Sequence, residues 1–598
     1  MSDPSPSRPP SDIDRILFDL RGVFVGLALI SGVINLLALT GSLYMMQVYD
    51  RVLASRSVPT LVALTTVVVI AYAAQGTLEY LRTRILQRIG LHVDGLLGRR
   101  AYRAVLEIPL RLRSGGDGMM PLRDLDTIRT FLSSAGPGAL VDLPWMPIFL
   151  IFTFLLSPWL SLLATLGALI LIGLAVLSER ITQEPARAAA GEHARRFSLA
   201  ESTRRNTEAL RAMGMSNRFV ERWATMNETA LARRSEADDR TAAIAALSRG
   251  LRYLLQSATL GLGAWLVIRG ELAGGSIIAG SIATTRALAP IDAAIANWKN
   301  LTAARQARDR LDLAFRGLPE TPPPMPLPPP VAELALDHVW AGPPRSPPIV
   351  QDVTLTLRAG DGLGIIGPSS AGKSSLARAM VGVWQPSRGS VRLDGAALDQ
   401  WDFEALGRHI GFLPQDCELF DGTVAQNIGR FDETATPEET VAAARAAGVH
   451  ELVLALPQGY DTRIGESGSM LSAGQRQRIG LARALFRDPF LIVLDEPNSN
   501  LDADGDAALT RAIRAVRERR GIVVVVAHRP SAIAAVDRVA VMANGRLQAF
   551  GPKDEVLNKA TIQAPAPAPA AAAPAPRSPA PPRPLAAPAR PTPDGRKH

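Results

Sequence analysis

Residues 367–375 read GPSSAGKSS, and this stretch decides how the second half of the chain folds. The apolar residues Leu363, Ile365 and Ile366 before it predict a buried strand that leads into a glycine-containing turn. A polyphosphate needs backbone N–H donors at close range and a cation. The glycines let the backbone bend around the anion, and the Lys and Ser that follow supply a charge and a hydroxyl for Mg²⁺. The predicted phosphate loop comprises Gly367, Pro368, Ser369, Ser370, Ala371, Gly372, Lys373, Ser374 and Ser375.

A second buried strand is predicted at residues 491–494, which read LIVL and are followed by two acids. Phosphoryl transfer depends on positioning and charge stabilisation, so one acid suits the metal and the other suits the attacking water. We therefore predict that Asp495 binds Mg²⁺ together with Ser374, and that Glu496 is the general base.

Two further polar residues are predicted to complete this site. His528 ends the apolar strand at 522–528, IVVVVAH, and is expected to contact the γ-phosphate as a catalytic residue. Gln415, in FLPQD, suits the metal and the water, although a surface glutamine would look the same in isolation.

A second anion site is predicted at residues 471–478, LSAGQRQR, which open a helix. Ser472 and Gly474 place a hydroxyl and open backbone amides at the helix N-terminus. One nucleotide does not need two such sites from one chain. The hypothesis is therefore that two chains meet head to tail, with Ser472 of one closing over phosphates held by Lys373 of the other.

Composition separates two unlike halves of the 598-residue chain, which has a net charge of +9 and is 47% hydrophobic and 20% charged. Its length suggests two or three domains. The arginines cluster beside apolar runs, which favours charge at a membrane boundary over nucleic-acid binding. The single cysteine, Cys417, excludes an intramolecular disulfide and metal clusters built on several cysteines.

Long uncharged runs in the first half predict six membrane-spanning helices. Residues 22–49 and 57–78 each exceed the ~20 residues that a helix needs to cross a bilayer. The run at 143–178 is divided into two spans that turn near Ser157, Pro158 and Trp159. Residues 253–268 and 272–285 are the weaker last pair, for which buried soluble helices are the alternative.

Flanking charge predicts the orientation of these spans. Residues 79–142 contain ten arginines and residues 179–252 contain fourteen, whereas the short turns on the other side hold very few. Positive charge stays on the cytoplasmic side, so both long segments and both termini are expected there. The first 20 residues lack a basic start with a cleavage site, which predicts a cytoplasmic lead and no signal peptide.

Both long cytoplasmic segments are helical in pattern, so the membrane helices are expected to continue beyond the bilayer. Residues 119–132 and 209–219 are candidate contacts for the ATPase domain, with a solvated helical face as the alternative. Charged or kinking residues near the spans are candidate transport determinants or helix-end pairs. They are Asp142, Pro144, Pro147, Arg286, Pro290 and Asp292.

Proline content marks the predicted boundaries. GLPETPPPMPLPPP, at 317–330, is too proline-rich to be helical and is expected to be extended. The Ala/Pro tract from 561 onward is expected to be disordered. The predicted domains are a lead (1–20), a membrane domain (21–304), a linker region (305–330), an ATPase domain (331–560) and a tail (561–598).

The order of these motifs resembles ATP-binding cassette (ABC) transporters. Six spans before the cassette resemble the exporter type, which works as a dimer of half-transporters, over roughly residues 20–557. The resemblance implies ATP and Mg²⁺ as cofactors, contact of TRIGES (462–467) with the membrane domain, and a homodimer with Asp502 across its interface. The segment that completes the partner's ATP site would be Leu471, Ser472, Ala473, Gly474 and Gln475.

Two positions depart from that family. Ala473 replaces the usual glycine of the 471–475 segment. The aromatic residue expected to stack on adenine is missing from VWAGPP, where Trp340 is nearby but Pro343 occupies the place.

A finer resemblance is to the ATPase/permease subunits of type I protein secretion systems that export proteases and calcium-binding-repeat proteins. YMMQVYDRVLASRSVPTL (44–61), DLPWMPIFL (142–150), AMGM (212–215) and RALAPID (286–292) carry it. It implies a periplasmic membrane fusion protein, an outer-membrane channel protein and a secreted protein as partners, beside membrane lipid. With only about 20 residues before the first span, no peptidase domain is expected, so the cargo would keep an uncleaved C-terminal signal.

The predicted fold is thus a six-helix transmembrane ABC exporter domain followed by an α/β P-loop nucleotide-binding domain. The favoured function is ATP-driven protein export across the inner membrane. A lipid or drug exporter and a non-transporting regulatory ATPase are the alternatives. MQVYDRVL argues against the former, and the presence of Glu496 and His528 argues against the latter.

Overall fold

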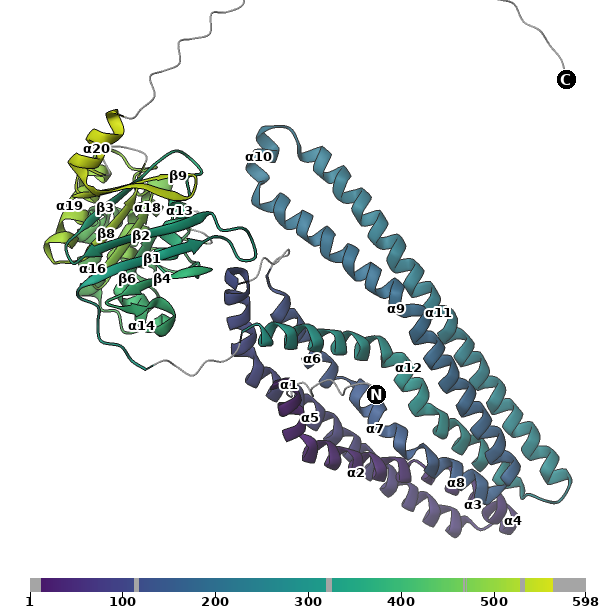
Figure 1. The fold of residues 1–598 in the computed structure, drawn as a ribbon. Helices are drawn as coiled ribbons and strands as arrows, with labels where there is room; N and C mark the ends of the chain where they lie inside the picture. The colour runs from purple at the N-terminus through teal and green to yellow at the C-terminus, as the bar shows by residue number, and fades with distance from the viewer. Residues whose placement is uncertain are drawn as a thin grey trace, which may run out of the picture. The chain divides into compact units, whose positions relative to one another are not determined.

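The computed structural model describes residues 12–111, 118–318, 325–465, 468, 470–527 and 533–562. Backbone contacts divide the chain into two compact units. The helical unit comprises Met1–Pro323 and Pro343–Ser346, and the sheet unit comprises Pro324–Gly342 and Pro347–His598. Figure 1 shows the long helices of the first unit and the strands of the second.

The described part of the helical unit contains α-helices, one π-helical turn (η1) and one 3₁₀ turn (η2). Its first elements are α1 (Asp12–Asp19), α2 (Arg21–Leu37), α3 (Thr40–Gln47), η1 (Val48–Val52), α4 (Leu53–Ser55), α5 (Val58–Arg111) and α6 (Met120–Leu132). They are followed by α7 (Ala135–Asp142), η2 (Leu143–Trp145), α8 (Met146–Leu156), α9 (Pro158–Arg205), α10 (Thr207–Ala212), α11 (Ser216–Ile268) and α12 (Gly274–Arg316).

Five segments of the described chain are long and apolar enough to cross a membrane. They coincide with the first five predicted spans: Arg21–Ser55, Val58–Arg111, Ala135–Leu156, Pro158–Ile181 and Ser216–Ile268. The turn predicted near Ser157 is confirmed, because Ser157 is extended, with φ −162° and ψ 133°, and α9 starts at the next residue. The predicted continuation of the helices is also confirmed, since α5, α9 and α11 have 54, 48 and 53 residues.

The sixth predicted span falls on α12, whose first turns are rich in Gly, Ala, Ser and Thr and not in large apolar residues. This composition has a packing reason. Ala279, Ala283 and Ala287 are fully buried, and a Cβ at Gly280 would lie 3.1 Å from Leu160 Cδ1. α12 packs against α3, α7, α8, α9 and α11. Small residues let helices approach closely within a membrane bundle, so α12 is its central helix although its hydropathy is low.

α12 also changes one predicted boundary. The linker region was predicted to begin at residue 305, but α12 continues to Arg316 because Ala307, Leu311 and Phe315 bury an apolar stripe of its last turns. The described residues between 317 and 330 form neither helix nor strand. The tail beyond residue 562 lies outside the described residues.

The sheet unit starts with an antiparallel sheet and continues as an α/β fold. Its strands are β1 (Glu333–Ala341), β2 (Val350–Arg358), β3 (Gly362–Ile366), β4 (Arg388–Leu393), β5 (Ala396–Ala397), β6 (Ile410–Leu413), β7 (Leu491–Asp495), β8 (Ile522–Val526), β9 (Arg538–Ala543) and β10 (Arg546–Pro552). Its helices are α13 (Lys373–Met380), η3 (Leu398–Gln400), α14 (Phe403–His409), α15 (Val424–Ile428), α16 (Pro437–Ala446), α17 (His450–Leu454), η4 (Gly459–Asp461), α18 (Ala473–Leu485), α19 (Ala503–Glu518) and α20 (Lys553–Ile562).

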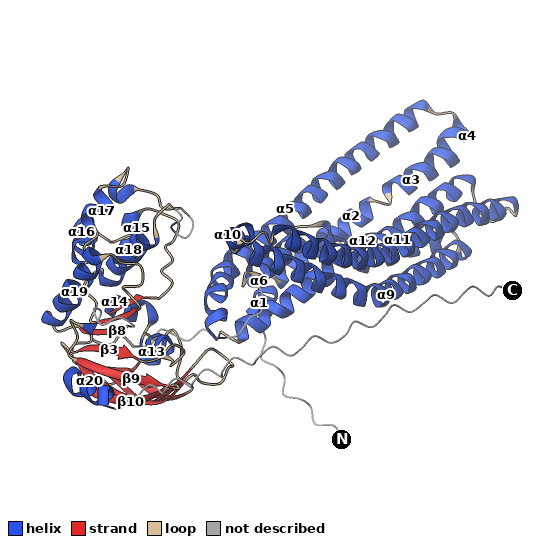
Figure 2. Cartoon of the chain, turned by 90° about the horizontal axis from the view of Figure 1, so that it is seen from above, coloured by secondary structure: helices blue, strands red, loops and turns tan. Residues whose placement is uncertain are grey.

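The strands form two sheets, drawn red in Figure 2, with helices beside them. One sheet has the order β2-β1-β4-β5 and the other has the order β10-β9-β3-β8-β7-β6. In the second sheet β9, β3, β8, β7 and β6 run parallel. β7 and β8 are buried at every residue, as expected for a parallel sheet covered on both faces. The carboxyl ends of β3 and β7 therefore meet at one edge.

One half-buried arginine joins α14 and α18 of the sheet unit to strand β6 of its larger sheet. The Arg430 guanidinium donates to the carbonyl oxygens of Gly407 at 2.6 Å, Arg483 at 2.9 Å, and Ile410 and Ala484 at 3.2 Å each. Burial lowers the pKa of Arg430 to about 10. Composition and periodicity gave no signal for this residue, because all four acceptors are backbone atoms far away in sequence.

Replacing Arg430 should destabilise the sheet unit. Arg430→Met leaves several buried carbonyl groups without a donor, which costs on the order of 3 kcal/mol. Thermal unfolding of the full chain in detergent should then show the apparent unfolding temperature of this unit about 5–10 °C lower. Arg445→Met removes an exposed arginine from α16 and is the matched control. Equal unfolding temperatures for the two variants would contradict the assignment.

Candidate nucleotide-binding and catalytic site

The predicted phosphate loop joins β3 to α13. Gly367 has φ 152°, and a Cβ there would lie 2.1 Å from the carbonyl oxygen of Met542. Gly372 has φ 93° and caps α13. Both conformations favour glycine, and the close approach at Gly367 leaves no room for a side chain. The loop therefore has the shape that the sequence predicted, a strand-to-helix turn with backbone amides at a helix N-terminus.

Lys373 is the first residue of α13 and is folded back over the loop. Its Nζ donates to the carbonyl oxygens of Gly367 at 2.9 Å and Pro368 at 3.0 Å, and the residue is only 5% exposed. Burial lowers the pKa of the Lys373 ammonium, whereas the charges of Glu496 and Asp495 raise it. A buried ammonium whose hydrogen bonds within the described residues go to neutral carbonyls is suited to a polyphosphate.

Asp495 ends β7 and contacts the same loop. The Ser374 hydroxyl donates to Asp495 Oδ1 at 3.0 Å. Asp495 is 1% exposed, and its Oδ2 is buried without a hydrogen-bond partner in the described residues. Burial raises the pKa of the Asp495 carboxyl, and the Ser374 hydrogen bond opposes that rise. A hard cation takes oxygen ligands, so a buried, unsatisfied carboxylate oxygen beside a hydroxyl fits Mg²⁺.

Glu496 follows Asp495 in a conformation that the sheet imposes. Its φ is 51°, and its N–H donates to the carbonyl oxygen of Val526 at 3.0 Å. Gln415 Nε2 donates to Glu496 Oε2 at 3.2 Å. The structure thus brings Gln415, Asp495, Glu496 and the phosphate loop together, as the sequence predicted.

The second predicted anion site begins α18. Ser472 is its N-cap: Ser472 Oγ accepts from the Gln475 N–H at 3.2 Å, and Gln475 Oε1 accepts from the Ser472 N–H at 2.8 Å. A Cβ at Gly474 would lie 2.8 Å from the Asn500 carbonyl oxygen. Ser472 and Ala473 are exposed, so their side chains are accessible to a partner. Leu471 is 5% exposed and packs in the core.

Gln477, one turn into α18, was missed by the sequence reasoning. It is 3% exposed, and its Nε2 donates to the Glu496 carbonyl oxygen at 3.1 Å and to Ser499 Oγ at 3.2 Å. Its Oε1 accepts from the Asn500 N–H at 3.0 Å. This side chain therefore connects the helix that begins at Ala473 to the backbone of the predicted general base. The only sequence signal was a second glutamine in GQRQR.

Asp502, predicted to lie across a dimer interface, has partners within its own chain. It caps α19 by accepting from the Gly505 N–H at 2.8 Å, and it forms an ion pair with Arg478. The side chain remains 66% exposed. These bonds lower the pKa of the Asp502 carboxyl, with the backbone hydrogen bond from Gly505 as the largest cause.

His528 lies outside the described residues, as do parts of the 462–467 segment. Trp340 lies in β1, with the Arg388 guanidinium 6.0 Å from its ring centroid.

Two of the candidate transport residues form ion pairs in the helical unit. Arg82 Nη1 lies 3.0 Å from Asp142 Oδ1, and Asn35 Nδ2 donates to the same oxygen at 3.0 Å. Arg252 Nη1 lies 2.7 Å from Asp292 Oδ2. Both carboxylates thus have partners between helices. Pro290 is buried inside α12, Pro144 and Pro147 start η2 and α8, and Arg286 is exposed.

Family models match both units. The ABC transporter transmembrane region matches residues 23–286, and the ABC transporter model matches residues 350–499. Among solved structures, a bacterial Atm1-family ABC exporter with ATP bound has a TM-score of 0.78 at 23% identity, over 90% of this chain and 96% of that one. This likeness concerns the fold.

Proteins with similar sequences indicate which kind of ABC transporter this chain is. The type I secretion system ATP-binding protein PrsD of Rhizobium meliloti (strain 1021) is 53% identical over 92% of this chain and 94% of its own length. The toxin RTX-I translocation ATP-binding protein of Actinobacillus pleuropneumoniae is 30% identical over 90% of this chain and 76% of its own. The leukotoxin translocation ATP-binding protein LktB of a Pasteurella haemolytica-like species is also 30% identical, over the same shares.

Fold, site and relatives together define a multi-pass membrane protein with a transmembrane domain and an ATPase domain, an ABC exporter that couples ATP hydrolysis to transport. Within that class, the chain belongs to the type I secretion system ATPase/permease family.

Gln477 provides a test of this geometry. Gln477→Ala removes two hydrogen bonds that hold the backbone at and after Glu496, so kcat for ATP hydrolysis should fall about tenfold while ATP still binds. Gln548→Ala, which truncates an exposed glutamine on β10, should leave kcat unchanged. An unaltered kcat in Gln477→Ala would show that the contact does not position the base.

Proposed function

We propose that this protein is the inner-membrane ATPase/permease of a type I secretion system that moves an unfolded protein with an uncleaved C-terminal signal out of the cell. The observation that carries the proposal is the 53% identity to a type I secretion ATP-binding protein over nearly the whole of both chains. The described site supports the energy source, because Lys373, Ser374 and Asp495 meet where a polyphosphate would bind.

The names of the relatives support a protein cargo. Two of them are named for translocation of toxin RTX-I and of leukotoxin, and the 53% identical relative is named for type I secretion. We infer the same substrate class for this chain. A lipid or small-molecule exporter is not favoured by these relatives.

The residues of the site have distinct proposed roles in hydrolysis. The phosphate loop and Lys373 bind the phosphates of ATP, and Ser374, Asp495 and Gln415 hold Mg²⁺, which neutralises phosphate charge when bound. Glu496, positioned by its hydrogen bond from Gln415, takes a proton from the attacking water. His528 is proposed to contact the γ-phosphate.

The exposed start of α18 supports a composite site. Ser472 and Ala473 are exposed and lie at a helix N-terminus, which favours an anion supplied from outside the chain. The proposal is a homodimer in which residues 471–475 of each chain complete the ATP site of the other. Asp502 would then act from the same face, held by Arg478 within its own chain.

The proposed location is the inner membrane, with both termini and the ATPase domain in the cytoplasm. The arginine-rich segments at 79–142 and 179–252 support this orientation. A periplasmic membrane fusion protein and an outer-membrane channel protein are the proposed partners, so that cargo would cross both membranes in one passage.

ATP hydrolysis in lipid discs tests the function. Loss of general-base catalysis in Glu496→Gln should lower kcat by ~10²-fold or more. Glu433→Gln, an exposed carboxylate of the same unit, is the matched control and should retain full activity. Full activity in Glu496→Gln would overturn the assignment of the base.

Cargo peptides test the substrate class in the same preparation. A C-terminal peptide from a candidate secreted protein should change the wild-type rate, because it binds a state of the exporter that the scrambled peptide does not. If only lipids or small hydrophobic compounds change the rate, protein export is the wrong function.

A further inference from the structure

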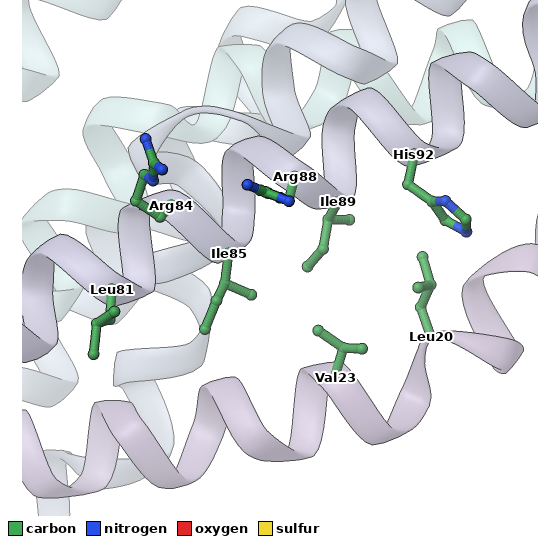
Figure 3. Close-up of a pocket in the computed structure, with 8 residues that line it drawn as sticks. All are labelled: Leu20, Val23, Leu81, Arg84, Ile85, Arg88, Ile89 and His92. Carbon is green, nitrogen blue, oxygen red and sulfur yellow. The ribbon is translucent and has the colours of Figure 1, made fainter.

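An open groove of about 410 Å³ lies between the start of α2 and the middle of α5. Its walls are largely apolar: Leu20 and Val23 come from the α2 side, and Ile85 and Ile89 come from the α5 side. Figure 3 shows these side chains directed toward one another across the groove. The volume is within the range of small-molecule sites, about 300–1,000 Å³.

The sequence places this groove at one boundary of the membrane. The uncharged run of α2 starts after Arg21, and the uncharged run of α5 ends before Glu79. Residues 81–92 of α5 thus cover roughly 16 Å of helix immediately beyond the apolar span. Tyr80, 60% exposed, marks the same level, where aromatic residues are enriched at membrane–water interfaces.

Two arginines line the groove beside its apolar floor. Arg84 and Arg88 are one helical turn apart on α5 and are both exposed. Residues four apart lie on one helix face, with Cβ atoms about 5–6 Å from each other. Arg84 lies over the Tyr80 ring at 5.7 Å, and within the described residues no carboxylate forms an ion pair with either arginine. The groove therefore combines an apolar slot with two cations that form no ion pair with any carboxylate of the described residues.

We propose that this groove binds an anionic phospholipid, with its phosphate between Arg84 and Arg88 and an acyl chain along Val23, Ile85 and Leu81, toward the apolar span of α5. Charge complementarity selects this occupant: a zwitterionic lipid offers the same acyl chain but no net charge to the two arginines. Basic sites between membrane helices on the cytoplasmic side bind anionic head groups. The assignment to the cytoplasmic leaflet rests on the proposed orientation of the chain.

Native mass spectrometry of the full chain in detergent tests the proposal. The protein is titrated with dioleoyl phosphatidylglycerol or dioleoyl phosphatidylcholine, and the number of retained lipids is counted. The wild type should retain phosphatidylglycerol in preference, and this preference should weaken as salt is raised. Arg84→Gln with Arg88→Gln should reduce the affinity for phosphatidylglycerol by about tenfold or more, because both cations are lost.

Arg99→Gln with Arg103→Gln is the matched control, since these arginines have the same spacing on α5, are exposed and lie outside the groove. This control should keep the preference. Ile85→Trp, which fills the slot, should reduce retention of phosphatidylglycerol without changing a charge.

Equal losses in the two double variants, or equal retention of both lipids by the wild type, would overturn the proposal. A photoreactive phosphatidylglycerol should cross-link to residues 81–92, and cross-links elsewhere alone would also overturn it. A photoreactive residue at Leu81 that captures residues 1–11 of the chain in place of lipid would assign the groove to the N-terminal segment. Neither ATP nor cargo is present, so failure here would leave the proposed export function standing.

Discussion

The contact between Ser374 and Asp495 is the interaction on which the ATPase domain depends. β3 and β7 both pair in parallel with β8, so the phosphate loop and the acid pair leave the sheet at the same edge. Burying a carboxylate is costly unless it is hydrogen-bonded or binds a cation. Asp495 has the Ser374 hydroxyl on one oxygen and no partner in the described residues on the other. The unpartnered oxygen, beside the buried Lys373 ammonium, makes this edge complementary to a metal-bound polyphosphate.

The cost of burying an unpaired charge also affects the membrane domain. Two ion pairs near the spans join different helices, Arg82 with Asp142 and Arg252 with Asp292. Removing one partner of a pair would leave the other charge half-buried and unpaired. These pairs therefore help to fix how α5 packs on α7 and how α11 packs on α12. α12 contributes through small residues that admit its neighbours closely.

Local patterns were predictable from the sequence, and contacts between distant segments were not. The phosphate loop, β7 with its acids and the Ser472 cap each depend on a few consecutive residues. The proline-rich stretch predicted at 317–330 agrees with the end of α12 at Arg316, whereas the domain boundary predicted at residue 305 did not account for burial of Leu311 and Phe315. Gln477 and Arg430 were missed because their partners are mostly backbone atoms 19 to 54 residues away. The role of α12 was also hidden, because its small residues are explained only by the distant helices that pack against it in the tertiary fold.

The central claim is that the two anion sites of one chain serve two different nucleotides, and a mixed pair of disabled chains tests it most directly. Lys373→Ala and Ser472→Arg chains carrying different tags are co-purified, and vanadate-trapped, photoreactive labelled nucleotide is followed on each chain. If the sites are composite, the mixed pair has one intact site, so label should appear only on the Ser472→Arg chain and only when its partner is present. Absence of label in the mixed pair, or label at both sites, would contradict the account.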